Sequence, residues 1–183
     1  MKTKKIIAGA TAILVASSVA AGAAMAQLTV TQSKIFADGF GRARVGMTPQ
    51  EVSKVAGTRL VSLSGAPIQN KGCFYVKPAH TPTGVEFMLT DGRISRIDVT
   101  RNTQITTVSG ARIGDTESRI KSLYPGQIKV TPHKYVKGGH YLTFTSKEPL
   151  YKNYRVVFET DGKRVTQYRA GKLPEVEFVE RCG

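Results

Sequence analysis

One segment of the chain concentrates side chains that are suited to binding another molecule. Residues 129–141 read Lys-Val-Thr-Pro-His-Lys-Tyr-Val-Lys-Gly-Gly-His-Tyr and combine three lysines, two histidines and two tyrosines around a Gly-Gly turn. Tyrosine offers a large amphipathic surface at a low cost in conformational entropy, and recognition loops are rich in it. The candidate binding residues of this segment are His133, Lys134, Tyr135, Lys137, His140 and Tyr141.

Three interpretations of this segment are compatible with its residues. It is an ordinary exposed hairpin whose tyrosines fold back on the core, a recognition loop, or a metal site in which His133 and His140 meet across the turn. Two histidines without a carboxylate or a cysteine are a poor set of metal ligands. We therefore expect no metal here, and the first two interpretations stay open.

The sequence lacks the short motifs that mark common catalytic sites. It contains no His-Glu-x-x-His, no Cys-x-x-Cys, no Gly-x-x-x-x-Gly-Lys-Ser/Thr and no Gly-x-Ser-x-Gly. Gly39 and Gly41 match two glycines of a dinucleotide-binding fingerprint, but Arg44 occupies the third position. We therefore expect a protein that is not an enzyme, with no catalytic residues and no cofactor.

The balance of charges fits weak attraction to an anionic partner, and the plainer explanation of the same balance is solubility. The chain has 27 Lys and Arg against 13 Asp and Glu, which gives a formal net charge of +14 at pH 7. The surplus is spread evenly along the chain, and a basic surface of this kind attracts lipid headgroups, polysaccharides and acidic protein faces. No basic-aromatic motif of a nucleic-acid-binding fold is present, so we expect no specific nucleic-acid partner.

The first 26 residues have the organisation of a signal peptide. Lysines near the start precede an uncharged apolar stretch at 6–24, and Ala24-Met25-Ala26 forms the small-x-small pattern that signal peptidase cleaves. The alternative is an uncleaved membrane anchor, but Ala, Gly and Ser make the stretch only weakly hydrophobic. We expect cleavage after Ala26, a periplasmic or secreted mature chain, and no transmembrane span after cleavage.

The two cysteines, Cys73 and Cys182, both lie in the expected mature chain. An oxidising compartment favours a disulfide over two buried free thiols. The bridge would close a loop of about 110 residues and contribute up to ~4–5 kcal/mol in the chain-entropy model. We therefore predict a Cys73–Cys182 disulfide.

Two sequence blocks recur in the same order along the chain. Residues 44–48, Arg-Val-Gly-Met-Thr, return as Arg-Ile-Gly-Asp-Thr at 112–116. The block at 87–94, which contains Thr-Asp-Gly, returns at 158–165. Recurrence of both blocks indicates a tandem duplication. The expected division of the chain is a signal peptide at 1–26, a first repeat at 27–103 and a second repeat at 104–183.

Each recurring block also predicts local structure. A Thr-Pro-x-Glu capping box at 48–51 begins a short helix that Gly57 ends, and Thr116 begins a second helix. The Asp-Gly pairs at 91–92 and 161–162 lie between alternating apolar residues, which predicts two-residue hairpin turns. We expect an α+β fold of two tandem repeats, each a short helix followed by an antiparallel β-meander, with a C-terminal strand in the second.

The Gly-Met-Thr-x-x-Glu-Val motif at 46–52, with the helix and meander that follow, resembles two related envelope families. One is the SmpA/OmlA outer-membrane assembly lipoproteins, which have a single such unit. The other is the β-lactamase inhibitory protein group, in which two units in tandem present a concave sheet surface. The duplication makes the chain more similar to this second group, although that group usually has a disulfide within a repeat, and the chain lacks the lipidation signal of the first.

Two further blocks resemble exported bacterial proteins, some of them labelled lectins. These blocks are His-Lys-Tyr…Gly-Gly-His-Tyr-Leu at 133–142 and Glu-Val-Glu-Phe-Val-Glu-x-Cys at 175–182. The resemblances and the composition together imply an exported binding protein that recognises an envelope or extracellular protein by steric occlusion, as an inhibitor or an envelope factor does. The alternative is a lectin-like module for carbohydrate or anionic polysaccharide, in which Tyr135 and Tyr141 stack on sugar rings.

Overall fold

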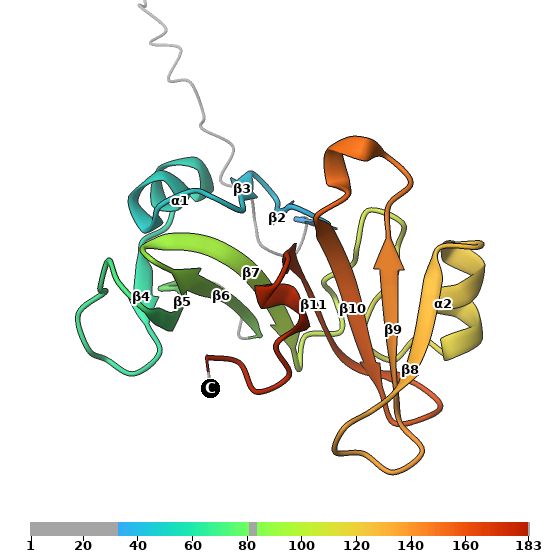
Figure 1. Ribbon diagram of the computed structural model, residues 1–183. Helices are drawn as coiled ribbons and strands as arrows, with labels where there is room; N and C mark the ends of the chain where they lie inside the picture. Colours follow the sequence, from blue (N-terminus) through green and yellow to red (C-terminus); the bar gives the residue numbers. More distant parts are fainter. Residues whose placement is uncertain (1–32, 81–83, 183) are drawn as a thin grey trace, which may run out of the picture.

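The computed structural model describes residues 33–80 and 84–182 (Figure 1). Most of the regular structure in these residues is β-strand, and the two α-helices are short. The predicted signal peptide at 1–26 lies outside the described residues. None of the described helices has the length and the apolar composition that crossing a bilayer requires.

Eight strands form the large antiparallel sheet. The first half contains β4 (Leu60–Ser62), β5 (Cys73–Pro78), β6 (Val85–Thr90) and β7 (Arg93–Thr100). The second half contains β8 (Ile128–Pro132), β9 (His140–Thr145), β10 (Tyr154–Thr160) and β11 (Val165–Lys172). The order across the sheet is β4-β5-β6-β7-β11-β10-β9-β8, so the two halves meet where β7 pairs with β11.

The main hydrophobic core lies on one face of this sheet. A small sheet of β1 (Ile35–Phe36), β2 (Gly39–Phe40) and β3 (Ala43–Arg44) contributes to it, as do the helices α1 (Pro49–Ala56) and α2 (Glu117–Leu123). One cluster of buried side chains joins Val52 of α1, Phe40 of β2 and Ile120 of α2 to the inward residues of the large sheet. We call this side of the large sheet the core face.

The predicted α+β fold of two tandem helix-plus-meander repeats is wrong. The described residues are mostly β, and the helices have only eight and seven residues. Strands expected in two separate repeats form one continuous sheet, because five residues of β7 pair with five of β11, with Ile97 opposite Ala170. This pairing joins residues far apart in the sequence, and the helices share one core with both halves.

The predicted local structure is correct at some positions and wrong at others. The capping box of Thr48 and Glu51 is present, and Asp91-Gly92 forms a two-residue turn in which both residues have positive φ. The second turn is longer than predicted, because residues 161–164 separate the paired residues of β10 and β11. There the Asp161 side chain accepts hydrogen bonds from the next backbone N–H groups, which stabilises the longer turn.

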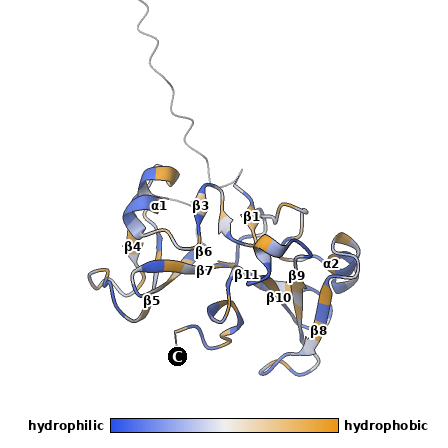
Figure 2. Cartoon of the chain, turned by 45° about the horizontal axis from the view of Figure 1, so that its top comes forward, coloured by the Kyte–Doolittle hydropathy of each residue, from blue (hydrophilic) through white to orange (hydrophobic). Residues whose placement is uncertain are grey.

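The other face of the sheet, which we call the open face, is crossed by residues 173–182. Apolar and polar residues alternate along strands such as β8 and β9, as the colours of Figure 2 indicate. Because successive side chains of a strand point to opposite faces, the polar residues Lys129, Thr131, Thr143 and Thr145 lie on this face. We call residues 173–182 the strap. The predicted C-terminal strand is wrong, because the strap contains the single-turn 3-10 helix η3 (Glu175–Glu177) and no strand.

The Cys73–Cys182 disulfide confirms the predicted bridge. It attaches the end of the strap to β5, in the first half of the sheet, across 109 residues of chain. A disulfide is compatible with an exported protein, since such bonds persist in oxidising compartments.

Candidate functional site

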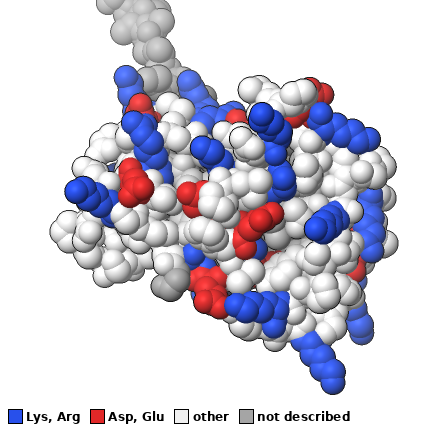
Figure 3. All heavy atoms as spheres, in the orientation of Figure 1, with Lys and Arg blue, Asp and Glu red and all other residues white. Residues whose placement is uncertain are grey.

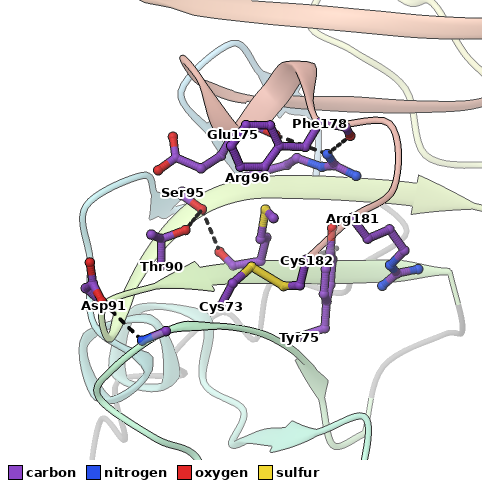
Figure 4. The surroundings of a disulfide bond; sticks show 12 residues. Cys73, Tyr75, Thr90, Asp91, Ser95, Arg96, Glu175, Phe178, Arg181 and Cys182 are labelled. Carbon is purple, nitrogen blue, oxygen red and sulfur yellow. Dashed lines mark hydrogen bonds between the residues drawn. A yellow bond between two sulfur atoms is a disulfide. The ribbon is translucent and has the colours of Figure 1, made fainter.

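Two arginine side chains hold the strap on the open face, and Figure 4 shows the contacts of the first, Arg96. Arg96 of β7 donates hydrogen bonds to the backbone carbonyl oxygens of Glu175 and Phe178. Arg169 of β11 donates from Nε to the carbonyl oxygen of Val176, over 2.6 Å. Because strap carbonyls bind these side chains rather than a neighbouring strand, the strap crosses the sheet without joining it.

The two buried arginines are each neutralised by a carboxylate on the same face. The Arg96 guanidinium lies 2.7 Å from Oδ1 of Asp98, and the side chain is only 2% exposed. Arg169 forms an ion pair with Glu159. A buried ion pair adds little net stability, but removal of one partner leaves an unpaired buried charge. These arginines are therefore structural supports of the strap.

The loop of residues 133–139 is anchored by His133. Its Nδ1 accepts hydrogen bonds from the backbone N–H groups of Tyr135 and Val136, over 3.1 and 3.2 Å. The proton of the neutral ring is therefore on Nε2, which lies 3.2 Å from Oε2 of Glu159. The ring also stacks on Tyr141, with 4.4 Å between ring centroids. His133 consequently fixes the loop on the sheet and is not free to bind a ligand.

Glu159 is the acceptor at the centre of this buried cluster. Burial raises the pKa of its carboxyl group, but the hydrogen bond from Gln167 and the positive charge of Arg169 lower it more, so the net shift of the pKa is downward. The carboxylate is therefore ionised at neutral pH, and its negative charge offsets the positive charge of the Arg169 guanidinium.

His140 and Tyr141, which are neighbours in β9, point to opposite faces of the sheet. Nδ1 of His140 lies 2.8 Å from a carboxylate oxygen of Glu117 in α2. His133 and His140 therefore do not meet across the turn. Tyr141 is 9% exposed and packs against Val157. It consequently lies under the strap instead of standing out as an exposed aromatic residue.

The remaining candidates lie on the surface, next to the strap. Lys134 forms an ion pair with Glu180 over 2.8 Å, and the Tyr135 hydroxyl donates to the same carboxylate. The hydrogen bond from Lys134 lowers the pKa of Glu180, and the same bond raises the pKa of Lys134. Tyr135 is 59% exposed, and Lys137 is exposed at the loop tip. The six predicted residues are thus split between buried supports and this exposed group.

An open pocket of about 340 Å³ lies on the open face, beside the strap. Its lining includes Tyr141, Thr143 and Thr145 of β9, which are alternate residues and so point to one side of the sheet. Lys129 of β8 and Arg155 of β10 lie on either side of β9. We call this cavity the open-face pocket. Sequence reasoning did not select its threonines or Arg155, although the two-residue period of β9 indicates that Tyr141, Thr143 and Thr145 share a face.

On the face of the molecule that Figure 3 shows, charged side chains are distributed and do not form a single patch. Figure 3 shows Lys and Arg side chains spread over the visible face, with acidic groups among them. Within residues 33–80 and 84–182, no group of three His, Cys, Asp or Glu side chains is placed to hold a metal ion. The arrangement therefore offers surfaces and a pocket for binding.

Comparison of the chain with known proteins identified no relative. No protein-family model matches the chain, and neither a curated protein nor a solved structure matches it. The resemblance to the envelope families consequently stays a prediction from the sequence.

Proposed function

We propose that the chain is a non-catalytic binding protein that recognises a protein partner through the loop–strap surface. This surface consists of the exposed side chains of Lys134, Tyr135, Lys137, Phe178 and Glu180. The observation that supports the proposal is the exposure of two aromatic side chains, Tyr135 at 59% and Phe178 at 43%, on adjoining segments. Exposed aromatic side chains on a firm scaffold are typical of the residues that dominate binding energy.

The two segments of this surface are held together before any partner binds. Lys134 and Phe178 line the same shallow pocket, and Glu180 contacts both Lys134 and Tyr135. The disulfide fixes the end of the strap. A surface ordered in advance loses less conformational entropy on association. The partner would thus dock on a rigid surface, and the lysines would steer an acidic partner toward it.

The test is capture of partners by immobilised residues 27–183 from an envelope extract of the source organism, at low and high salt. We expect a discrete protein that is retained at high salt by the native sequence and lost by the double variant Tyr135→Ala/Phe178→Ala. The matched control is Leu150→Ala, which removes an apolar side chain that is 78% exposed elsewhere on the surface. Equal retention by all three proteins would contradict the proposed surface.

A second candidate function, binding of an anionic polysaccharide, is favoured by the spread of basic side chains in Figure 3. An electrostatic ligand of this kind contacts many separate charges, so salt weakens it strongly and a single substitution weakens it little. In the capture experiment it would elute with salt and would bind equally to the aromatic double variant. Recovery of only such a polymer would replace the first proposal by the second.

A further inference from the structure

The strap shows what kind of chain the open face accommodates. Residues 175–180, Glu-Val-Glu-Phe-Val-Glu, combine three acidic with three apolar side chains. Val176 is fully buried in a cluster with Tyr141 and Val157, while the carboxylate of Glu180 binds the ammonium group of Lys134. The face thus holds the strap through an apolar contact and the arginine–carbonyl bonds described above, and an exposed lysine of the neighbouring loop pairs with one strap carboxylate.

The open-face pocket lies beside the strap and shares apolar residues with the cluster that buries Val176. Val157 and Tyr141, which bury Val176, also line the pocket. Thr131, Thr143 and Thr145 line it as well, and within the described part of the chain none of their side-chain hydroxyl groups has a hydrogen-bond partner. Hydroxyl groups both donate and accept, so these three are suited to the N–H and C=O groups of a peptide.

The pocket carries positive charge that the protein does not neutralise. Among residues 33–80 and 84–182, neither Lys129 nor Arg155 forms an ion pair, and Arg155 donates only to backbone carbonyl oxygens. The charge of Arg169, by contrast, is offset by Glu159. Glu177 contributes one carboxylate to the lining. Two basic side chains therefore remain available to an anion in the pocket.

The dimensions of the pocket suit a short extended segment. Thr143 pairs with Lys129 on one side of β9, and Thr145 pairs with Arg155 on the other. The lining from Tyr141 to Thr145 follows four steps of an extended chain, which at a rise of about 3.3 Å per residue is roughly 13 Å. Three or four extended residues have this length, and a carboxylate among them would lie between the two basic groups.

We propose that the open-face pocket binds an acidic segment of the partner protein, in which a carboxylate side chain neighbours an apolar one. This inference rests on the proposed function and names the chemistry of the partner. The loop–strap surface makes the aromatic contacts, and the pocket receives the acidic segment. The apolar side chain packs on Val157 and Tyr141, while the carboxylate pairs with Lys129 and Arg155.

The experiment uses the disulfide-bonded mature chain and a synthetic peptide with the sequence of residues 174–180, Pro-Glu-Val-Glu-Phe-Val-Glu, blocked at both ends. Binding is followed by backbone NMR chemical shifts. We expect the shifts to centre on residues 129, 143 and 155. We also expect affinity at least about tenfold lower for a peptide with Gln in place of each Glu, because two charge pairs of roughly 0.7 kcal/mol each are lost.

The charge-reversed variant Lys129→Glu/Arg155→Glu should lose peptide binding to a greater extent, because the new carboxylates also repel the acidic peptide. Its matched control is Lys54→Glu/Lys121→Glu, which makes the same change in net charge on exposed residues of α1 and α2. Equal loss in both variants, equal binding of the Gln peptide, or shifts away from the pocket would overturn the inference. Binding of an acidic oligosaccharide, and not of the peptide, at residues 129, 143 and 155 would also overturn it.

Partner capture separates this inference from the proposed function. If Lys129→Glu/Arg155→Glu retains a captured protein that Tyr135→Ala/Phe178→Ala loses, the proposed function stands and the acidic-segment inference fails. If neither the native chain nor any variant captures a protein, the proposed function fails. Loss of the captured protein in both double variants, with both control variants unaffected, supports the proposed function and the acidic-segment inference together.

Discussion

The two halves of the open face differ in how their charged side chains are satisfied. In the first half, Arg96 is paired with Asp98, and Arg181 of the strap is paired with Glu86 and lies over the Tyr75 ring. In the second half, Lys129 and Arg155 line an open pocket, and no ion pair occupies either of them within the described residues. The same face thus combines a strapped first half, whose charges hold the chain together, with an open second half, where Arg169 is likewise paired with Glu159 but Lys129 and Arg155 have no carboxylate partner.

The contrast gives a criterion for separating structural from functional charges in this fold. A buried cation whose carboxylate partner and carbonyl acceptors are all present contributes to holding the chain together. A cation at the surface or half-buried, without a carboxylate partner, contributes little to stability and is available to a ligand. Substitutions of the buried, paired charges should therefore lower the free energy of unfolding, and substitutions of the unpaired cations that line the open-face pocket should leave it nearly unchanged.

The largest expected effect is loss of the disulfide. Cys73→Ser/Cys182→Ser should lower the free energy of unfolding by about 4–5 kcal/mol, because the unfolded chain regains the freedom of a long loop. Urea unfolding followed by circular dichroism measures this change. A decrease in the free energy of unfolding of less than about 1 kcal/mol would show that the arginine contacts hold the strap without the disulfide.

Arg96→Ala should have the next largest effect. The substitution leaves the buried carboxylate of Asp98 unpaired and removes the donor to two strap carbonyl groups, which should cost about 3–4 kcal/mol. The same urea experiment on Arg155→Ala, in the open half, should show a change below about 1 kcal/mol. Equal losses in the two variants would contradict the division between the halves.

Acid should weaken the buried cluster around Glu159, in the second half of the sheet. The pKa of Glu159 is lowered from its ordinary value of 4.5 in the folded protein, so the associated stability is present above that value and is lost as the pH falls through the lower folded value. The urea midpoint should therefore decrease between pH 5 and pH 2, and decrease less in Glu159→Gln. Parallel decreases in the two proteins would assign the acid sensitivity to other carboxylates.

The smallest expected effect is that of Lys129→Ala and Thr143→Val in the open half. Neither side chain has a polar partner in the described part of the molecule, so the free energy of unfolding should change by no more than about 0.5 kcal/mol. Thermal unfolding of both variants measures it. A loss above about 1 kcal/mol in either would assign these residues a structural role and weaken the interpretation of the pocket as a binding site.

Part of the candidate site was predictable from the sequence. The composition of residues 129–141 directed attention to the loop, and Lys134 and Tyr135 do lie exposed beside the strap. The sequence did not show that His133 anchors the loop through Glu159, since the two residues are brought together only by the pairing of β8 with β9 and of β9 with β10. Arg155 was missed for the same reason.

The sequence by itself determined the local structure whose hydrogen bonds close within a few residues. The capping box at Thr48 and the turn at Asp91-Gly92 are of this kind, and the Cys73–Cys182 disulfide followed from the count of cysteines in an expected oxidising compartment. Only the tertiary structure decided which residues meet across the sheet. The pairing of β7 with β11 made one sheet of two expected repeats, and the strap buried Tyr141. Such contacts depend on strand order and on packing between distant residues, which a local pattern does not encode.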